Sequence, residues 1–490
     1  MRKLILQVAV MLGVCALAVT GAITQTSMTE TVALTGVNIV DVESGGVRSN
    51  QTIVVSAATG RIVAIAAGAT TKLQATRSID ATGKFVIPGL WDMHVHTLQP
   101  NRESYLAMFI ANGVTGVRDM GTSLSNLALA HAWRRETLDG KRIAPRIYAS
   151  GPILGSPQPQ NALPVGSAAE ARAAVQTLKS HGADFVKVYS LLSRPAFLAV
   201  LDEAKKQQLD VVGHVPLWVT ASEASDDGQK SMEHSYGLLE SCSTHESELR
   251  KEVERAAANQ DTWAAWGAVV RTTDRLYGAQ ARDQSYSKEK CEALFARFVR
   301  NGTWQCPTLV VRRAFALRDD LVFTNDPRMK ALPPSVTDAW RNSQADTRNR
   351  ELSADELRDR RIRLAKESEL TGDMHRAGVG ILAGTDLGNP YLYPGSSLHD
   401  ELGLLTRAGL SALDALRTAT LNPARFFGLS DTFGTVAQGK VADLVLLDAN
   451  PLDDIANTQR IYGVVANGRY FARTELDALQ NAGQDRVRGR

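Results

Sequence analysis

The chain lacks the features that mark several classes of protein. Its 490 residues include only four cysteines, none in a CxxC pair, so we expect no cysteine-ligated metal site. Lys and Arg number 55 against 52 Asp and Glu, which provides neither the basic patch of a nucleic-acid-binding protein nor an acidic tail. The chain shows no internal repeat and no low-complexity linker. We therefore expect an ordinary globular protein without a nucleic-acid partner.

One long hydrophobic run is present, and it lies at the N-terminus. Arg2 and Lys3 precede an apolar stretch over residues 4–19, and small residues follow at positions 20–22. This order predicts a secretory signal peptide over residues 1–22. An uncleaved membrane anchor is the alternative, but the run is short for about 30 Å of hydrocarbon. We expect a secreted or periplasmic protein without stable membrane insertion.

The cysteines that follow the signal peptide are Cys242, Cys291 and Cys306. An odd number permits at most one internal disulfide, in keeping with an oxidising compartment. Cys242 and Cys291 are one conceivable pair, and the sequence alone does not select it.

Strand-like, turn-rich segments occupy both ends of the chain, at residues 31–80 and 433–470. Between them, eight short apolar segments alternate with helical ones, which is typical of a (β/α)8 barrel of about 250 residues or more. The predicted strands are residues 89–94, 113–119, 146–149, 185–189, 211–214, 231–234, 303–308 and 380–385. We expect an α/β protein with a (β/α)8 TIM barrel over residues 85–428. Residues 23–84 and 429–490 are expected to form one small β-sandwich domain.

The alternation is interrupted by a long region over residues 240–369. This region is rich in Glu, Arg, Lys and Ala with few glycines, which predicts long helices. An insertion on the loop side of a barrel shapes a substrate pocket or an oligomer contact, or it is a solvated decoration. We expect a homo-oligomer, with the role of the insertion left open.

A pair of histidines ends the first predicted strand of the barrel. His94 and His96 lie two apart in GLWDMHVH, and side chains at this spacing share one face of a strand. Both imidazoles can therefore reach one ion at the carboxyl end of the strand, where barrel active sites lie. An HxH pair alone is weak evidence, because the spacing arises often by chance.

Four further residues lie at or near the ends of later predicted strands: Lys187, His214, His234 and Asp386. A lysine facing a barrel interior is costly unless its charge is paired or removed. Each residue alone fits a buried histidine or a capping aspartate. Their joint occurrence at strands four, five, six and eight, with the histidine pair at strand one, indicates a metal centre.

These segments resemble the amidohydrolase superfamily, particularly the branch similar to imidazolonepropionase and to prolidase-like dipeptidases. The matching segments are PGLWDMHVH (88–96), FVKVY (185–189), GHVP (213–216), EHS (233–235), GTD (384–386), NPARFFGL (422–429) and GTVAQGKVADLVLLD (434–448). The resemblance extends over nearly all of residues 31–470, but residues 242–369 carry no matching motif and leave the substrate open.

The resemblance implies two divalent ions, most simply Zn²⁺, with Mn²⁺, Co²⁺ or Fe²⁺ as alternatives. His94, His96 and Asp386 would hold the more buried ion, and His214 and His234 the more exposed one. Lys187 would carry a carboxyl group on its amine and bridge the two ions.

The resemblance also implies hydrolysis of amide bonds in peptides or N-acyl amino acids by a hydroxide that bridges the ions. Asp386 would transfer the proton from water to the leaving amine as general acid and base. Tyr236 is expected to stabilise the oxyanion, and Tyr189 and Arg118 to contact a substrate carboxylate, although each also fits a packing or rim position. The expected partner is a small molecule or dipeptide. The same centre also suits cyclic amides, lactones and phosphotriesters, and a degenerate barrel that only binds is the non-enzymatic alternative.

The metal content of the purified protein separates these alternatives. Because no predicted ligand is missing, we expect about two divalent ions per chain by elemental analysis. A protein that holds none after metal supplementation would match the degenerate barrel instead.

Overall fold

The computed structural model describes residues 30–68, 75–98, 103, 105–156, 161–258, 262–283, 285–317, 323, 325–344 and 353–488. The predicted signal peptide over residues 1–22 lies outside this part of the chain. Within the described ranges, no helix combines the length and apolar character that a membrane crossing requires.

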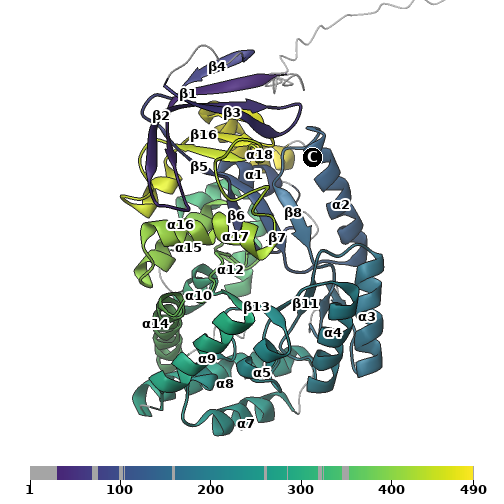
Figure 1. The fold of residues 1–490 in the computed structure, drawn as a ribbon. Coiled ribbons are helices and arrows are strands. Elements are labelled where there is room, and N and C mark those ends of the chain that lie inside the picture. Colours follow the sequence, from purple (N-terminus) through teal and green to yellow (C-terminus); the bar gives the residue numbers. More distant parts are fainter. Residues whose placement is uncertain are drawn as a thin grey trace, which may run out of the picture.

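Both ends of the chain contribute strands to one sheet, as the sequence predicted (Figure 1). Its strand order is β17-β16-β15-β5-β1-β2-β3, with β4 paired to β1 beside this path. The strands are β1 (Thr31–Val40), β2 (Val47–Ser56), β3 (Arg61–Ala67), β4 (Arg77–Asp80), β5 (Phe85–Pro88), β15 (Leu444–Leu447), β16 (Ile461–Ala466) and β17 (Arg469–Ala472). The pairing of β5 with β15 joins the two ends of the chain. The expected two-layer sandwich stays a prediction.

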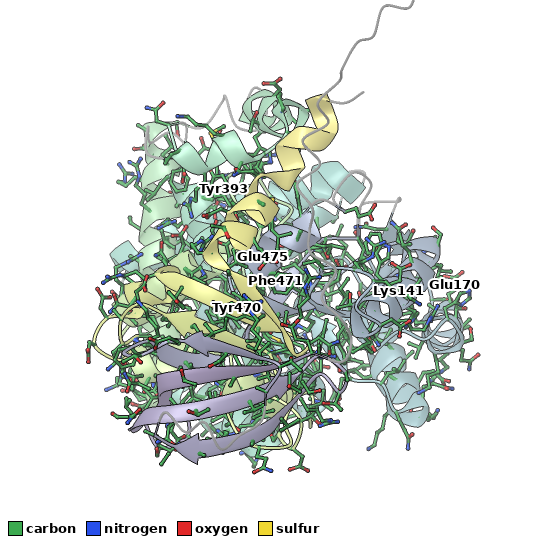
Figure 2. The ribbon with its side chains drawn as sticks, turned by 90° about the horizontal axis from the view of Figure 1, so that it is seen from above. Lys141, Glu170, Tyr393, Tyr470, Phe471 and Glu475 are labelled. Atoms are coloured by element: carbon green, nitrogen blue, oxygen red, sulfur yellow. A yellow bond between two sulfur atoms is a disulfide. The ribbon has the colours of Figure 1, made fainter. Side chains whose placement is uncertain are left out.

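The two faces of this sheet pack against different cores, because side chains alternate along a strand. On β15, Leu444 and Leu446 pack with Ile39 and Ile53 inside the curled sheet. Val445 and Leu447 belong to the large core that the remainder of the molecule shares. Tyr470 and Phe471 of β17 also lie on opposite sides, close to Glu475 of α18 (Arg473–Arg488) (Figure 2). The sheet is thus tied to the rest of the chain by its own hydrophobic pattern.

Parallel strands form in all the predicted barrel segments except the last. They are β6 (Leu90–Val95), β7 (Val114–Asp119), β8 (Arg146–Ala149), β11 (Val186–Val188), β12 (Val211–Gly213), β13 (Gln229–Glu233) and β14 (Trp304–Cys306). Two short strands that the sequence did not predict, β9 (Ile153–Leu154) and β10 (Ala162–Leu163), extend the sheet beside β11.

The eighth predicted segment, residues 380–385, is not a continuous strand, but it links the first and last parallel strands. The Leu382 amide donates to the Gln305 carbonyl of β14, and the Met93 amide of β6 donates to the Ala383 carbonyl. Parallel bridges join Gln305 to Ile381 and Val95 to Leu387. This linkage is compatible with the predicted barrel and brings the ends of β6 and β14 together.

Helices follow the parallel strands and lie outside them. These are α1 (Tyr105–Ala111), α2 (Leu124–Leu138), α3 (Ala168–Ser180), α4 (Arg194–Gln207), α5 (Ala221–Asp226), α15 (Ser396–Arg407), α16 (Ala412–Thr418) and α17 (Leu421–Phe426), with the 3-10 helix η3 (Ile455–Gln459) before β16. Local chemistry marks where they begin: Ser167 and Glu170 form a capping box at the start of α3.

The long region after β13 is helical, as predicted. It contains α6 (Leu238–Ser241), α7 (Glu246–Ala257), α8 (Thr262–Asp283), α9 (Lys288–Asn301), α10 (Leu309–Ala316), η2 (Pro327–Ala331), α12 (Pro334–Gln344) and α14 (Ala354–Arg376). Helices α7 and α8 lie at the end of the molecule opposite the sheet (Figure 1). A disulfide joins Cys242, which ends α6, to Cys291 on α9, and Cys306 is a free buried thiol. The pairing that the sequence left open is therefore present.

This disulfide predicts a measurable dependence of stability on redox conditions. The bond joins residues 49 apart, and a loop of that size stabilises the folded state by about 2–4 kcal/mol. We expect the double variant Cys242→Ser/Cys291→Ser to have a free energy of unfolding about 2–4 kcal/mol lower than that of the wild type, measured by denaturant titration. Dithiothreitol should destabilise the wild type but leave this variant unchanged, and equal sensitivity of both proteins would contradict the assignment.

Candidate metal centre

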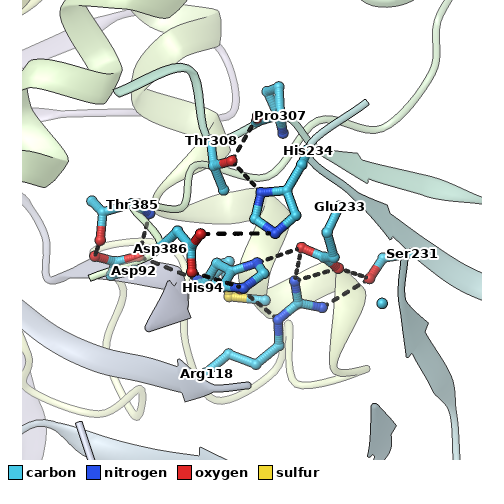
Figure 3. Close-up of polar contacts among 12 residues, drawn as sticks. Asp92, His94, Arg118, Ser231, Glu233, His234, Pro307, Thr308, Thr385 and Asp386 are labelled. Carbon is cyan, nitrogen blue, oxygen red and sulfur yellow. Dashed lines mark hydrogen bonds and ion pairs between the residues drawn. The ribbon is translucent and has the colours of Figure 1, made fainter. Parts of the chain in front are cut away.

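Histidines from two strand ends lie around the carboxylate of Asp386: His94 and His96 at the end of β6, and His234 after β13. Figure 3 shows His94 and His234 beside Asp386. Asp386 Oδ1 lies 3.4 Å from His94 Nε2 and 3.3 Å from His96 Nε2, and its Oδ2 lies 3.9 Å from His234 Nε2. The fourth predicted histidine, His214, stacks edge-on against His234 with ring centroids 4.9 Å apart. The structure thus brings together the predicted histidines and Asp386.

The opposite ring nitrogen of three of these histidines is held by a buried partner. His94 Nδ1 lies 2.9 Å from Glu233, His214 Nδ1 lies 2.8 Å from Ser190 Oγ, and His234 Nδ1 lies 2.6 Å from Thr308 Oγ1. An outer partner of this kind fixes the orientation of a metal-ligating imidazole and raises its basicity. The Nε2 atoms of His94 and His234 are consequently directed toward Asp386.

Lys187 is buried beside these groups, with 1% of its surface exposed. Its Nζ atom has no hydrogen-bond partner among the described residues. Burial lowers the pKa of Lys187 to about 8, and the carboxylates of Glu233 and Asp386 oppose this effect. Gly213 leaves room for the side chain, because a Cβ there would lie 2.9 Å from Lys187 Cδ and 2.2 Å from a backbone oxygen.

The protonation states of the site suit ligation. Burial and the charge of Lys187 hold the pKa values of His94 and His214 well below their usual range, so both rings are neutral at pH 7. Burial alone would raise the pKa of Asp386, but His234, His96 and Lys187 outweigh it and lower that pKa. Asp386 is therefore an anion at neutral pH.

Several residues at this centre have backbone conformations that side chains rarely adopt. φ is 61° at His234, 55° at Ser235, 50° at Thr308 and 59° at Asp386. Each such position costs on the order of 1–3 kcal/mol and persists only where the surroundings hold it. Their concentration at the strand ends marks this region as functional rather than merely packed.

Arg118 does not occupy the position that a substrate contact requires. Its side chain is fully buried, its Nη2 lies 2.9 Å from Glu233, and its Nε and Nη1 donate to Met93 and Ser231. The guanidinium therefore holds the carboxylate that holds His94. We correct the sequence-based prediction for Arg118 to a positioning role beneath the metal centre.

The two predicted tyrosines flank His214. The ring of Tyr189 lies 4.1 Å and that of Tyr236 4.8 Å from the His214 ring. Burial raises the pKa of both phenols, so each remains protonated and able to donate a hydrogen bond at neutral pH. Both rings therefore lie beside His214 as neutral phenols.

A small pocket opens next to Tyr236, lined by the loops after β12 and β13 and by helices of the insertion. Its walls are largely apolar, with Val215, Leu217, Val253 and Val269, and the polar residues Glu240 and Arg250 also line it. The pocket also touches Ser190, the partner of His214. It therefore adjoins the candidate metal centre.

These residues suit divalent ions. The ligand atoms of His94, His234 and Asp386 lie within 4.8 Å of one another, and nitrogen with carboxylate oxygen is a common set for Zn²⁺. A second group, His94, Glu233 and Cys306, meets the same distance. It suits a metal less well, because Glu233 is already paired with Arg118 and burial keeps the pKa of the Cys306 thiol high.

The residues that hold the histidines, Glu233, Ser190 and Thr308, were not predicted from the sequence. Glu233 directly precedes His234 in EHS, and a buried carboxylate next to a ligand is a signal that could have been used. Ser190 and Thr308 give no such signal, because small hydroxyl residues are common at strand ends.

A family model described as Amidohydrolase family matches residues 85–470. Among solved structures, the bottromycin amidohydrolase AH shares 25% identity at a TM-score of 0.69, over 93% of this chain and 91% of that one. A Xaa-Pro dipeptidase with bound methionine shares 19% identity at a TM-score of 0.63, over 90% of this chain and 100% of that one. A putative prolidase from Bifidobacterium longum shares 24% sequence identity at a TM-score of 0.65, over 93% of this chain and 99% of that one.

Curated relatives match over shorter stretches. Imidazolonepropionase from Sphingopyxis alaskensis is 42% identical over 76 residues, which are 15% of this chain and 19% of that protein. A 5-methylthioadenosine/S-adenosylhomocysteine deaminase from Teredinibacter turnerae is 32% identical over 99 residues. These residues are 19% of this chain and 22% of that protein. The chain thus matches about a fifth of the length of each of these two proteins.

The hydrogen bond between His234 Nδ1 and Thr308 Oγ1 predicts an effect on metal affinity. Thr308→Val removes the hydroxyl but keeps the branched shape, so we expect metal to bind roughly 10- to 100-fold more weakly in a chelator competition. Thr137→Val removes a buried hydroxyl on α2 and serves as the matched control. Equal metal affinity in both variants would contradict the role assigned to Thr308.

Proposed function

Since the chain belongs to the amidohydrolase family, we propose that it hydrolyses amide bonds in peptides or N-acyl amino acids at a centre of two divalent ions. The observation that carries this proposal is the buried amine of Lys187, which has no hydrogen-bond partner among the described residues and whose charge acts on His94, His214, His234 and Asp386. An isolated buried charge is too costly to persist, so the amine needs either neutralisation or an added anion.

We assign Lys187 a carboxyl group on Nζ. The uncharged amine, which the lowered pKa makes accessible, forms a bond to the carbon of CO₂ and releases one proton. The product is an anion with two oxygens, able to bridge two ions. His94, His96 and Asp386 would hold one ion, and His214 and His234 the other, with Zn²⁺ as the simplest choice for these ligands.

Bound divalent ions supply a hydroxide at neutral pH and polarise a carbonyl oxygen. Asp386 is an anion that two imidazoles hold close to the centre, so its carboxylate can accept the proton of the attacking water. It then gives that proton to the nitrogen of the leaving amine, which completes cleavage of the C–N bond.

Tyr236 completes this arrangement as a hydrogen-bond donor. Its phenol remains protonated at neutral pH, and its ring lies 5.4 Å from His234 and 4.8 Å from His214. A fixed donor at this place would stabilise the oxyanion that forms when the carbonyl is attacked.

The apolar pocket beside Tyr236 supports a substrate with an apolar side chain or ring. Val215, Leu217, Val253 and Val269 provide the apolar surface, and two of them come from insertion helices. Names of structural neighbours include a Xaa-Pro dipeptidase and a bottromycin amidohydrolase, which agree with substrates of this class. We propose small dipeptides, including those that end in proline, and N-acyl derivatives of apolar amino acids.

We also propose that residues 85–428 close into a (β/α)8 barrel and that residues 23–84 and 429–490 form its companion β domain. Residues 1–22 would direct export. The disulfide between Cys242 and Cys291 supports an oxidising compartment.

The general-base role of Asp386 is tested by Asp386→Asn. The amide keeps the shape but cannot accept the proton, so we expect kcat to fall by at least about 10²–10⁴ while much of the metal remains bound. Asp400→Asn, which alters a carboxylate paired with Arg328, is the control and should retain activity. An Asp386→Asn variant with wild-type kcat would show that another group transfers the proton.

The substrate class is tested by screening the zinc-loaded protein against dipeptides and N-acyl amino acids. Turnover is expected with apolar residues, because the pocket offers few polar partners. Activity confined to lactones or phosphotriesters would overturn the proposed substrate class while leaving the metal centre intact.

A further inference from the structure

A buried group of charged residues from the insertion lies next to Tyr236. Arg312 on α10 forms two bonds with Glu367 on α14, from Nε at 2.8 Å and from Nη2 at 3.1 Å. Arg363 bonds the same carboxylate and also Asp274, and Arg360 bonds Asp274 as well. Three arginines therefore share two carboxylates in these ion pairs.

Arg312 and Arg363 both lie close to the ring of Tyr236. The guanidinium carbon of Arg312 is 5.8 Å and that of Arg363 is 5.7 Å from the ring centre. Tyr236 in turn stands 4.8 Å from His214. Both guanidinium groups therefore lie near the ring of the tyrosine that neighbours His214.

The fold holds Arg312 in a defined place relative to the metal centre. Helix α10 begins directly after Thr308, whose hydroxyl bonds His234. The amides of Leu309 and Val310 donate to the buried carboxylate of Glu401 at 3.0 Å and 2.7 Å. One helix thus connects a candidate metal ligand to Arg312, which lies one turn further along.

The bonds of these arginines leave donors unused. Glu367 engages Nε and Nη2 of Arg312, so Nη1 lies outside that pair, and the side chain is 10% exposed. Behind it, Nη2 of Arg363 is buried without a hydrogen-bond partner in the described part of the chain. A guanidinium with a free donor suits a carboxylate better than a neutral group, because charge-assisted hydrogen bonds are the stronger ones.

We propose that Arg312, beside the ring of Tyr236, binds the free carboxylate of the substrate's leaving amino acid. This inference rests on the proposed amide hydrolysis and adds the substrate class: peptides or N-acyl amino acids with an unblocked C-terminal carboxylate next to the cleaved bond. Glu367 orients Arg312 from behind.

The test compares the best dipeptide from the substrate screen with its C-terminal amide. The two differ only in the carboxylate, so we expect the wild type to favour the acid by about 10- to 100-fold in kcat/KM. In Arg312→Gln, KM for the dipeptide acid should rise by a similar factor, while KM for the dipeptide amide should change by less than about threefold. Inhibition by the free product amino acid should weaken in parallel.

Further variants separate recognition from folding. Arg312→Gln leaves Glu367 with one partner fewer, so Arg312→Gln/Glu367→Gln removes both charges and should show the same loss of selectivity. Arg312→Lys retains the charge without the planar donors. Its preference for the acid over the amide should lie between those of the wild type and Arg312→Gln. The neighbouring Arg313, which pairs with Asp400 at 3.5 Å, is the matched control, and Arg313→Gln should keep the wild-type preference.

The outcomes distinguish this inference from the proposed function. A wild type that cleaves acid and amide equally well, or an Arg312→Gln variant that loses both equally, would overturn the carboxylate site alone. A wild type that cleaves neither, at full metal occupancy, would overturn the amide hydrolysis on which it rests.

Discussion

The amine of Lys187 is the group on which the account of this protein depends. It is buried without a hydrogen-bond partner among the described residues, and its charge acts on His94, His214, His234 and Asp386. A buried lysine cation next to neutral imidazoles would cost free energy and would add no packing contact that an apolar residue could not supply. Converted to a carboxylated anion, the same residue becomes the link between two ions, and each surrounding side chain acquires a role.

The groups around Lys187 are arranged in layers. Nitrogen and oxygen atoms face the centre, and behind them Glu233, Ser190 and Thr308 hold the imidazoles. Arg118 lies one layer deeper and pairs with Glu233. A buried ion pair contributes little net stability, but removing one partner costs about 3–5 kcal/mol. The pair of Arg118 and Glu233 therefore orients His94, and a substitution of either partner destabilises the protein.

Residues at strand ends could be predicted from the sequence without knowledge of their neighbours. Side chains alternate between the two faces of a strand, and the active site of a barrel lies at the carboxyl ends of its strands. By these rules His94, His96, Lys187 and Asp386 were predicted as ligands, and the structure brings His94, His96 and Asp386 together. Arg118 was misplaced because its partner Glu233 lies on a distant strand, and only the fold reveals that contact. Arg312 gave no signal, since a charged helix does not show from sequence which of its arginines faces the site. Residues 380–385 were expected to be a regular strand, but the segment forms only one isolated parallel bridge, between Ile381 and Gln305.

The most direct test of the account is a crystal structure of the zinc-loaded protein with anomalous diffraction recorded at the zinc edge. The account predicts two anomalous peaks, one beside His94, His96 and Asp386 and one beside His214 and His234, with density for a carboxyl group on Lys187 Nζ between them. A bare Lys187 amine and no anomalous peak among these residues would contradict it.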